Sequence, residues 1–235
     1  MVHEGAPKGN HKMMYGVDTY ITGSSSNNDK IIVIYSDVYG NNLNNTLLVA
    51  DKLAGAGYKV LIPDILFGDF ADTDNFTMVD IPKWLNKHGL TETKVVVEKF
   101  LKGLKSEQSP KFIGLVGYCF GARFAIRQIS AASPLGDACA VAHPSNVTME
   151  EIAAIGKVPI MISAAETDVV FTMENRYATG QKLREIGATY IINLFSGVYH
   201  GFAIRGNLSS PDLRFAMNKT ISDQIYLFDH FSKKT

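Results

Sequence analysis

Short apolar runs alternate with longer stretches of helical character along this chain of 235 residues, and no other feature constrains its fold as strongly. Most of the runs are continuously apolar, which is typical of strands covered on both faces. The sequence predicts strands at residues 18–22, 30–37, 58–64, 111–118, 138–144, 158–166 and 189–197. It predicts helices at residues 42–56, 91–106, 120–132, 174–187 and 212–232. We therefore expect an α/β fold in which a mostly parallel central sheet is flanked by helices on both faces.

Neither a linker nor a repeat divides the chain, so we predict one domain over residues 1–235, with a flexible N-terminal tail at residues 1–13. The segment GSSSNND at residues 23–29 predicts a hairpin loop between the first two strands. Residues 65–90 have weak periodicity and predict a loop-rich insertion. Such an insertion would lie beside the strand ends, where ligand sites form in open α/β sheets.

Charge and composition limit the partners that such a chain can have. Lys plus Arg and Asp plus Glu number 23 each, without a long run of either sign, so we expect neither nucleic acid nor a membrane surface as partner. A small-molecule partner is the expectation, for a monomer or a weak homodimer. The N-terminus lacks the apolar core of a signal peptide, and no apolar segment approaches 18 residues, which predicts a soluble cytoplasmic protein.

The segment from Gly117 to Gly121 reads GYCFG and lies where a predicted strand meets a predicted helix. Gly-x-Cys-x-Gly at such a junction is the pattern of a nucleophile elbow with sulfur in place of oxygen. Glycine on either side permits a turn too tight for larger side chains. Cys119 would then project above the sheet at a helix N-terminus, where the helix dipole favours a thiolate. The alternative interpretation is a small buried core residue.

A thiol nucleophile needs a base, and the base needs an acid that orients it. His200 follows the last predicted strand and is the preferred base, while His143, at the end of an earlier strand, is expected to be a hydrogen-bonded pocket or core histidine. Asp168 follows the strand at 158–166 and is preferred over Glu166 as the acid. The resulting order of nucleophile, acid and base differs from that of papain-like peptidases.

Two other kinds of site receive less support from the sequence. A serine esterase would need Ser36 or Ser163, and neither serine lies between glycines at an elbow. The cysteines, Cys119 and Cys139, form no CxxC pair, and no His-rich cluster has metal-ligand spacing, so a structural zinc site, or another metal site, is not expected.

Three motifs, GYCFGA, SAAETD and FSGVYHGFAIRG, resemble those of the dienelactone hydrolase (carboxymethylenebutenolidase) family. The resemblance begins near residue 14 and is closest to fungal cytosolic members, which share DVYGN, VPDILFGD and AHPS. It implies an α/β-hydrolase fold without a cofactor. It also implies a triad of Cys119, Asp168 and His200 that opens an enol-lactone or a related ester through a thioester.

The same resemblance implies further site residues. Asp37 takes the position of a family glutamate that pairs with the resting thiol, and Val38 would supply an oxyanion N–H together with Phe120. Arg205 matches one of two arginines that bind a substrate carboxylate. The second arginine has no match because residues 40–122 contain none, and a lysine such as Lys83 or Lys87 cannot provide a bidentate fork.

Three aromatic residues complete the expected pocket: Tyr118, Trp84 and Phe202 are candidate apolar walls, with ordinary core packing as the alternative. The sequence therefore predicts a hydrolase of small activated esters or enol-lactones. The alternative function is a non-catalytic or redox-sensitive protein of the same fold that binds a small ligand.

Overall fold

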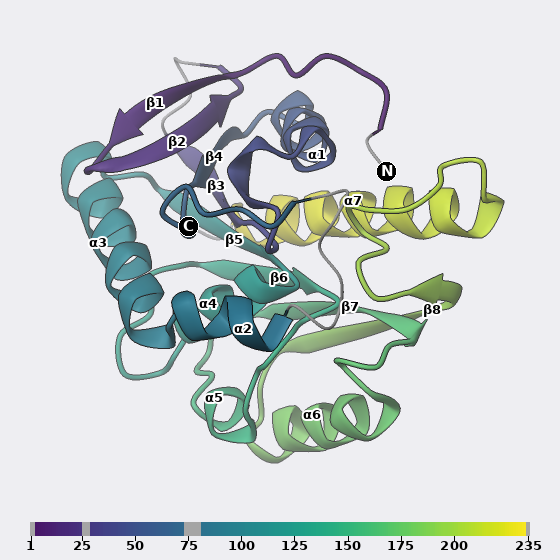
Figure 1. Ribbon diagram of the computed structural model, residues 1–235. Helices are drawn as coiled ribbons and strands as arrows, with labels where there is room; N and C mark the ends of the chain where they lie inside the picture. Colours follow the sequence, from purple (N-terminus) through teal and green to yellow (C-terminus); the bar gives the residue numbers. More distant parts are fainter. Residues whose placement is uncertain (1–2, 25–28, 73–80, 234–235) are drawn as a thin grey trace.

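Figure 1 shows the computed structural model, in which residues 3–24, 29–72 and 81–233 are described. Within these residues a central sheet of eight strands runs through the molecule. The strands are β1 (Asn10–Met14), β2 (Val17–Thr22), β3 (Lys30–Tyr35), β4 (Lys59–Pro63), β5 (Phe112–Tyr118), β6 (Ala138–Ala142), β7 (Ile160–Thr167) and β8 (Tyr190–Tyr199).

The strand order in the sheet is β1-β2-β4-β3-β5-β6-β7-β8. The β1–β2 and β2–β4 pairs are antiparallel, whereas all pairs from β4–β3 onward are parallel. The central strands β3, β5 and β6 are buried along nearly their whole length, which accounts for their continuous apolar sequences. Because these strands are parallel, the segments that follow β3, β5, β6 and β7 emerge at one edge of the sheet.

Helices cover both faces of the sheet (Figure 1). One face packs against α3, α4, α5 and α6, and the other packs against α1 and α7. In α3 the buried residues Val97, Phe100, Leu101 and Leu104 recur at the spacing of one helix face. The helices are α1 (Asn44–Gly55), α2 (Ile81–Lys87), α3 (Leu90–Gln108), α4 (Phe120–Arg127), α5 (Met149–Ala153), α6 (Met173–Glu185) and α7 (Pro211–Phe231), with a 3₁₀ turn at Gly40–Asn42. The predicted fold class is confirmed.

The N-terminal segment differs from the prediction. Residues 10–13, expected in a flexible tail, form most of β1 and pair with β2 through the turn at Tyr15 and Gly16. Further upstream, the His3 N–H donates a hydrogen bond of 2.6 Å to Asn45 Oδ1 of α1. The tail prediction is wrong for these residues because β1 is held mainly by backbone pairing, and its largely exposed side chains carry no apolar pattern.

The predicted hairpin at residues 23–29 is also wrong. The strands on either side, β2 and β3, are not neighbours, because β4 lies between them. Residues 25–28 of this loop lie outside the described part of the chain. Helix α4 is shorter than predicted, since the chain turns after Arg127 and Ser130 forms an antiparallel bridge with Ile155.

Candidate active site

Cys119 occupies a sharp turn between β5 and α4. Its backbone has φ 50° and ψ −112°, a conformation that is costly for a residue with a side chain. Two backbone hydrogen bonds hold the turn: Cys119 N–H donates to Ala142 O at 3.2 Å, and Ser145 N–H donates to Cys119 O at 3.1 Å. The end of β6 and the loop after it therefore fix the position of the thiol.

The two glycines of the elbow are required by close packing. A Cβ on Gly117 would lie 2.5 Å from Ala122 Cα, and a Cβ on Gly121 would lie 2.2 Å from Tyr35 O. Both distances are to backbone atoms, so neither contact could be relieved by a side-chain rotation. The second contact also shows that the end of β3 lies directly against the start of α4.

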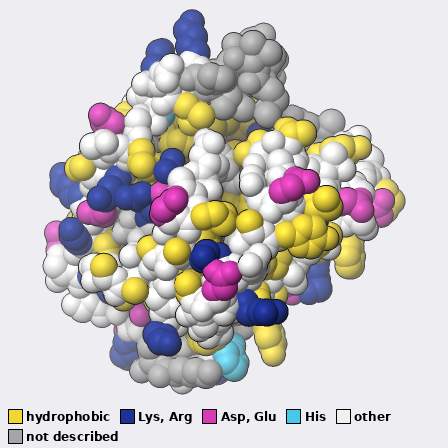
Figure 2. Space-filling model, turned by 90° about the horizontal axis from the view of Figure 1, so that it is seen from below, with side chains coloured by type: hydrophobic (Ala, Val, Ile, Leu, Met, Phe, Trp, Pro, Cys, Tyr) yellow, Lys and Arg dark blue, Asp and Glu magenta, His cyan; other side chains and the backbone are white. Residues whose placement is uncertain are grey.

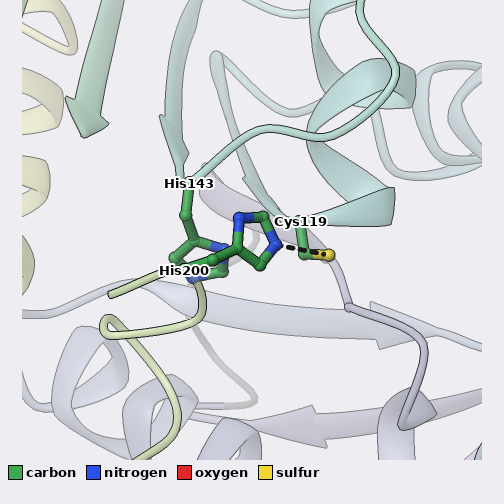
Figure 3. Close-up of side chains that lie close together, drawn as sticks. All are labelled: Cys119, His143 and His200. Carbon is green, nitrogen blue, oxygen red and sulfur yellow. Dashed lines mark hydrogen bonds between the residues drawn. The ribbon is translucent and has the colours of Figure 1, made fainter. Parts of the chain in front are cut away.

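His200 lies beside the Cys119 thiol, and Asp168 lies on the other side of the His200 ring. His200 follows β8, and its Nε2 lies 3.2 Å from Cys119 Sγ, as Figure 3 shows. Its Nδ1 lies 3.0 and 2.9 Å from the two carboxylate oxygens of Asp168, which follows β7. Asp168 Oδ1 also accepts hydrogen bonds from the N–H groups of Val170 and Phe171. Three residues far apart in the sequence thus form one hydrogen-bonded chain.

The electrostatics of this hydrogen-bonded chain favour a negative charge on Asp168 and a positive charge on His200. Burial alone would raise the pKa of the Asp168 carboxyl, but the hydrogen bond with His200 and those from two backbone N–H groups lower it below its ordinary value. Burial alone would lower the pKa of His200, but Asp168 and Cys119 raise it to about 9. The imidazole therefore holds its proton strongly while the Asp168 carboxylate faces it.

Asp37 and Arg205 form a second buried pair near the triad. Asp37 follows β3 and is fully buried, and its Oδ2 lies 3.4 Å from Arg205 Nε. Its Oδ1 accepts a hydrogen bond from Tyr39 N–H, and the Arg205 guanidinium stacks over the Tyr39 ring at 5.1 Å. Burial raises the pKa of the Asp37 carboxyl, and Arg205 only partly offsets this effect. Asp37, the expected partner of the resting thiol, thus contacts Arg205. The side chain that contacts the sulfur is instead His200.

The two residues expected to supply oxyanion N–H groups, Val38 and Phe120, lie in segments that pack against each other. Phe120 is the first residue of α4, so its N–H has no partner within the helix. Val38 lies in the segment after β3, which packs against the start of α4 at Gly121. Helix dipole and N–H groups together make this region suitable for a developing negative charge.

Comparison with known proteins agrees with this geometry. The profile of the dienelactone hydrolase family matches residues 17–232. This chain belongs to the dienelactone hydrolase family. Hydrolase tropI from Talaromyces stipitatus is 33% identical over 99% of this chain and 94% of its own length. Dienlactone hydrolase 1 from Gibberella moniliformis is 31% identical over 89% of this chain and 82% of its own length.

A solved structure supports the fold. The dienelactone hydrolase-like promiscuous phosphotriesterase P91 from metagenomic libraries superposes with a TM-score of 0.75 at 15% identity, covering 97% of this chain and 99% of its own. Family membership and fold together make the chain an ester or lactone hydrolase, which confirms that prediction and the family resemblance.

The aromatic candidates of this family member lie at different depths. Trp84 packs edge-to-face on Phe120 with ring centroids 5.3 Å apart. Phe202 is 2% exposed and packs against the ring of His143. Tyr118 has no exposed surface, and its hydroxyl donates a hydrogen bond to Gln224 Oε1 of α7. Tyr118 therefore packs toward α7, whereas Trp84 packs against the first residue of α4.

A cavity of about 470 Å³ lies next to Cys119 and is lined by its neighbours Phe120 and Ser145, although not by Cys119 itself. Its walls come from α2, the start of α4 and the loop after β6, and they include Leu85, Phe120, Ser145 and Val147. Lys83 and Lys87 do not provide a second cation here: Lys83 is exposed, and Lys87 Nζ lies 3.9 Å from Asp69 Oδ2 at the surface. In the described part of the chain, Arg205 is the cation paired with a carboxylate next to the triad.

His143 is the residue whose surroundings the sequence did not predict. It is fully buried, its ring centroid lies 5.1 Å from that of His200, and neither ring nitrogen has a hydrogen-bond partner among the described residues. Its burial agrees with the expected core histidine, but the expected hydrogen bond is not formed with any described residue. Burial lowers the pKa of His143 well below its ordinary value, and the charges of His200 and Arg205 lower it further. The signal available in the sequence was its place directly after β6, beside β5, which Cys119 follows.

Surface charge and helix composition can be compared with the expectation that neither nucleic acid nor a membrane is a partner. On the face shown in Figure 2, Lys and Arg side chains lie among Asp and Glu side chains rather than in one basic tract. Within the described residues, none of the helices combines the length and apolar character needed to cross a lipid bilayer.

Ser36 and Ser163, the two candidates for a serine esterase, are fully buried, and neither hydroxyl has a hydrogen-bond partner in the described chain.

Proposed function

We propose that this protein hydrolyses small activated esters or enol-lactones by nucleophilic catalysis at Cys119. His200 acts as general base and acid, Asp168 orients His200, and the reaction passes through a thioester. The observation that carries the proposal is the continuous chain from Asp168 through His200 to Cys119 Sγ, with contacts of 2.9 and 3.2 Å. Nucleophile, base and orienting acid within hydrogen-bond reach are the requirements of this chemistry.

The reaction begins when the thiolate of Cys119 attacks the ester carbonyl. The oxygen of the tetrahedral intermediate receives hydrogen bonds from the N–H groups of Val38 and Phe120. Collapse of the intermediate breaks the carbon–oxygen bond, and the leaving enolate or alkoxide takes a proton from His200. Water then loses a proton to His200 as it attacks the thioester, and the sulfur leaves as the acid product forms. An enol is a good leaving group, so this chemistry suits lactones better than amides.

Substrate binding involves the buried pair and the aromatic residues. Arg205 carries a positive charge beside the triad, and Asp37 holds its guanidinium in place at 3.4 Å. A substrate with a carboxylate or another anionic group would approach Arg205 while its carbonyl reaches Cys119. Trp84 and Phe202 supply apolar contacts, and the Tyr118 ring stacks against His143 with ring centroids 6.0 Å apart.

The test uses the two cysteines of the chain as a matched pair. Cys119→Ala should reduce hydrolysis of a chromogenic ester to the uncatalysed background, while circular dichroism shows an intact fold. Rapid acid quench followed by intact-mass measurement should detect one acyl group on the wild type and none on Cys119→Ala. Cys139→Ala removes the other thiol, which is buried, and should acylate like the wild type.

Two outcomes would contradict the proposal. Turnover retained by Cys119→Ala would exclude this sulfur as the nucleophile. Absence of an acyl-enzyme in the wild type, together with absence of turnover for a range of activated esters, would instead favour a binding or redox role for Cys119.

A further inference from the structure

The buried imidazole of His143 requires an explanation that the triad does not supply. His143 follows β6 and adopts φ 39°, and its ring lies between those of Tyr118 and Phe202 at 6.0 and 5.7 Å. Both ring nitrogens lack a hydrogen-bond partner among the described residues, although the residue is fully buried. A buried polar group without a partner costs about 1–3 kcal/mol, so such a group usually has a ligand or a functional role.

The position of this ring relative to the triad indicates which ligand it could bind. Cys119 Sγ and one ring nitrogen each of His143 and His200 all lie within 4.8 Å of one another. Figure 3 shows the three side chains converging from the end of β5, the end of β6 and the segment after β8. One thiolate and two imidazoles form a donor set that suits zinc and other thiophilic divalent transition metals.

The surroundings of His200 resemble those of a metal-bound histidine. Its Nδ1 faces the Asp168 carboxylate, which leaves Nε2 directed at the sulfur. Histidines that bind zinc commonly donate their second N–H to a carboxylate, because this fixes the tautomer and the ring orientation. The existing Asp168–His200 contact therefore orients His200 for a metal as well as for catalysis.

We propose that Cys119, His143 and His200 form a three-ligand site for Zn²⁺ or a similar thiophilic divalent metal, and that its occupation reversibly inhibits the enzyme. Tetrahedral zinc places sulfur and nitrogen ligands about 3.6 Å apart and two nitrogens about 3.3 Å apart. The contact of 3.2 Å between Cys119 and His200 widens slightly, and His143 moves toward them. Solvent or a substrate oxygen fills the fourth position.

Metal binding removes both reacting groups at once. The Cys119–His200 pair holds one proton, on sulfur or on nitrogen, and that proton is released to solvent when sulfur and Nε2 both bind the metal. The sulfur lone pair and the base are then occupied, so neither attack on an ester nor proton transfer can proceed. The inhibition rests on the proposed role of Cys119, whereas the metal binding does not.

Co²⁺ provides a direct probe that does not depend on activity. Bound to the metal-free full-length protein, it should give a sulfur-to-cobalt charge-transfer band together with the visible bands of a tetrahedral site. Cys119→Ala should lose the charge-transfer band, and His143→Gln should raise the dissociation constant at least about tenfold. His230→Gln, in the exposed last turn of α7, is the matched control and should bind like the wild type.

Zinc tests the consequence for activity. Micromolar Zn²⁺ should inhibit the wild type, excess chelator should restore the rate, and the same concentration of Mg²⁺ should have no effect. His143→Gln should need at least about tenfold more Zn²⁺ for half-inhibition of its own rate. His143→Phe repeats the measurement if the glutamine variant does not fold.

X-ray absorption of the zinc-loaded wild type reports the ligands without any substitution. One sulfur and two imidazoles at the metal would support the proposal. One sulfur and one imidazole, or equal metal affinity in the wild type and in His143→Gln, would overturn it. Tetrahedral Co²⁺ binding without esterase activity would refute the proposed function but leave the metal site standing, so the two failures are distinguishable.

Discussion

His143 and His200 are neighbouring histidines with opposite properties. Their ring centroids are 5.1 Å apart, and both residues follow strands at the same edge of the sheet. His200 has a carboxylate on one side and a thiol on the other, and its pKa is raised to about 9. His143 has no hydrogen-bond partner among the described residues, and burial, together with the charges of His200 and Arg205, lowers its pKa well below the ordinary value. The comparison shows that burial neutralises an imidazole unless a negative partner is positioned to hold the proton.

Replacement of the partnered histidine should have the largest effect. His200→Gln keeps a polar side chain but removes the base that contacts Cys119 Sγ. We expect kcat/KM for a chromogenic ester to fall about 10⁴-fold, the upper range for loss of general acid–base catalysis. Stopped-flow or plate-reader kinetics measure the change, with His230→Gln as the control that stays within about twofold. A loss smaller than tenfold would mean that another group deprotonates the thiol.

Removal of the Asp168 carboxylate should shift the pKa of His200 in the direction of the lowered pKa of His143. Asp168→Asn keeps the shape of the side chain but removes the negative charge at 2.9 Å from His200 Nδ1. We expect the pKa of His200 to fall toward or below its ordinary value and kcat/KM to drop about 10³-fold. Histidine NMR titration and the pH–rate profile report the two effects separately. An unchanged His200 titration would show that Cys119, and not Asp168, raises the pKa.

The two histidines should give the free energy of unfolding opposite dependences on pH. The pKa of His200 rises from 6.5 to about 9 on folding, so its contribution is complete below pH 6.5 and is lost as pH rises to about 9. This loss amounts to about 3 kcal/mol. The pKa of His143 falls on folding, so stability decreases below pH 6.5, by about 1.4 kcal/mol per pH unit, as the unfolded chain gains a proton that the folded chain excludes.

Urea unfolding of three proteins at several pH values tests both dependences. In Asp168→Asn, the free energy of unfolding should decrease less above pH 6.5 than in the wild type. In His143→Phe, it should decrease less below pH 6.5, while its dependence above pH 6.5 stays unchanged. His143→Phe replaces an unpartnered polar ring with an apolar one, so its stability near pH 7 should equal or exceed that of the wild type. Identical pH profiles for all three proteins would contradict the assigned charge states.

Local sequence signals predicted the central sheet well and its first edge poorly. The apolar runs of β3 and β5 are buried nearly throughout, so their sequences resemble buried strands. In β1, four of the five side chains are exposed, and the strand exists because its backbone pairs with β2. The same reason explains why the hairpin predicted at residues 23–29 is wrong. Whether β2 pairs with β3 or with β4 depends on competition between segments distant in the sequence, and the turn residues carry no information about that competition.

The amino-acid sequence by itself determined the elbow and the order of its partners. Glycine at 117 and 121, an apolar strand before Cys119 and polar residues directly after the last two strands are local features, and parallel strands bring such ends to one edge. Tertiary structure alone decided that Arg205 pairs with Asp37 and that His143 has no hydrogen-bond partner among the described residues. These pairings depend on the distances and burial that arise when separate strand ends pack together, and burial in turn sets which side chain carries charge.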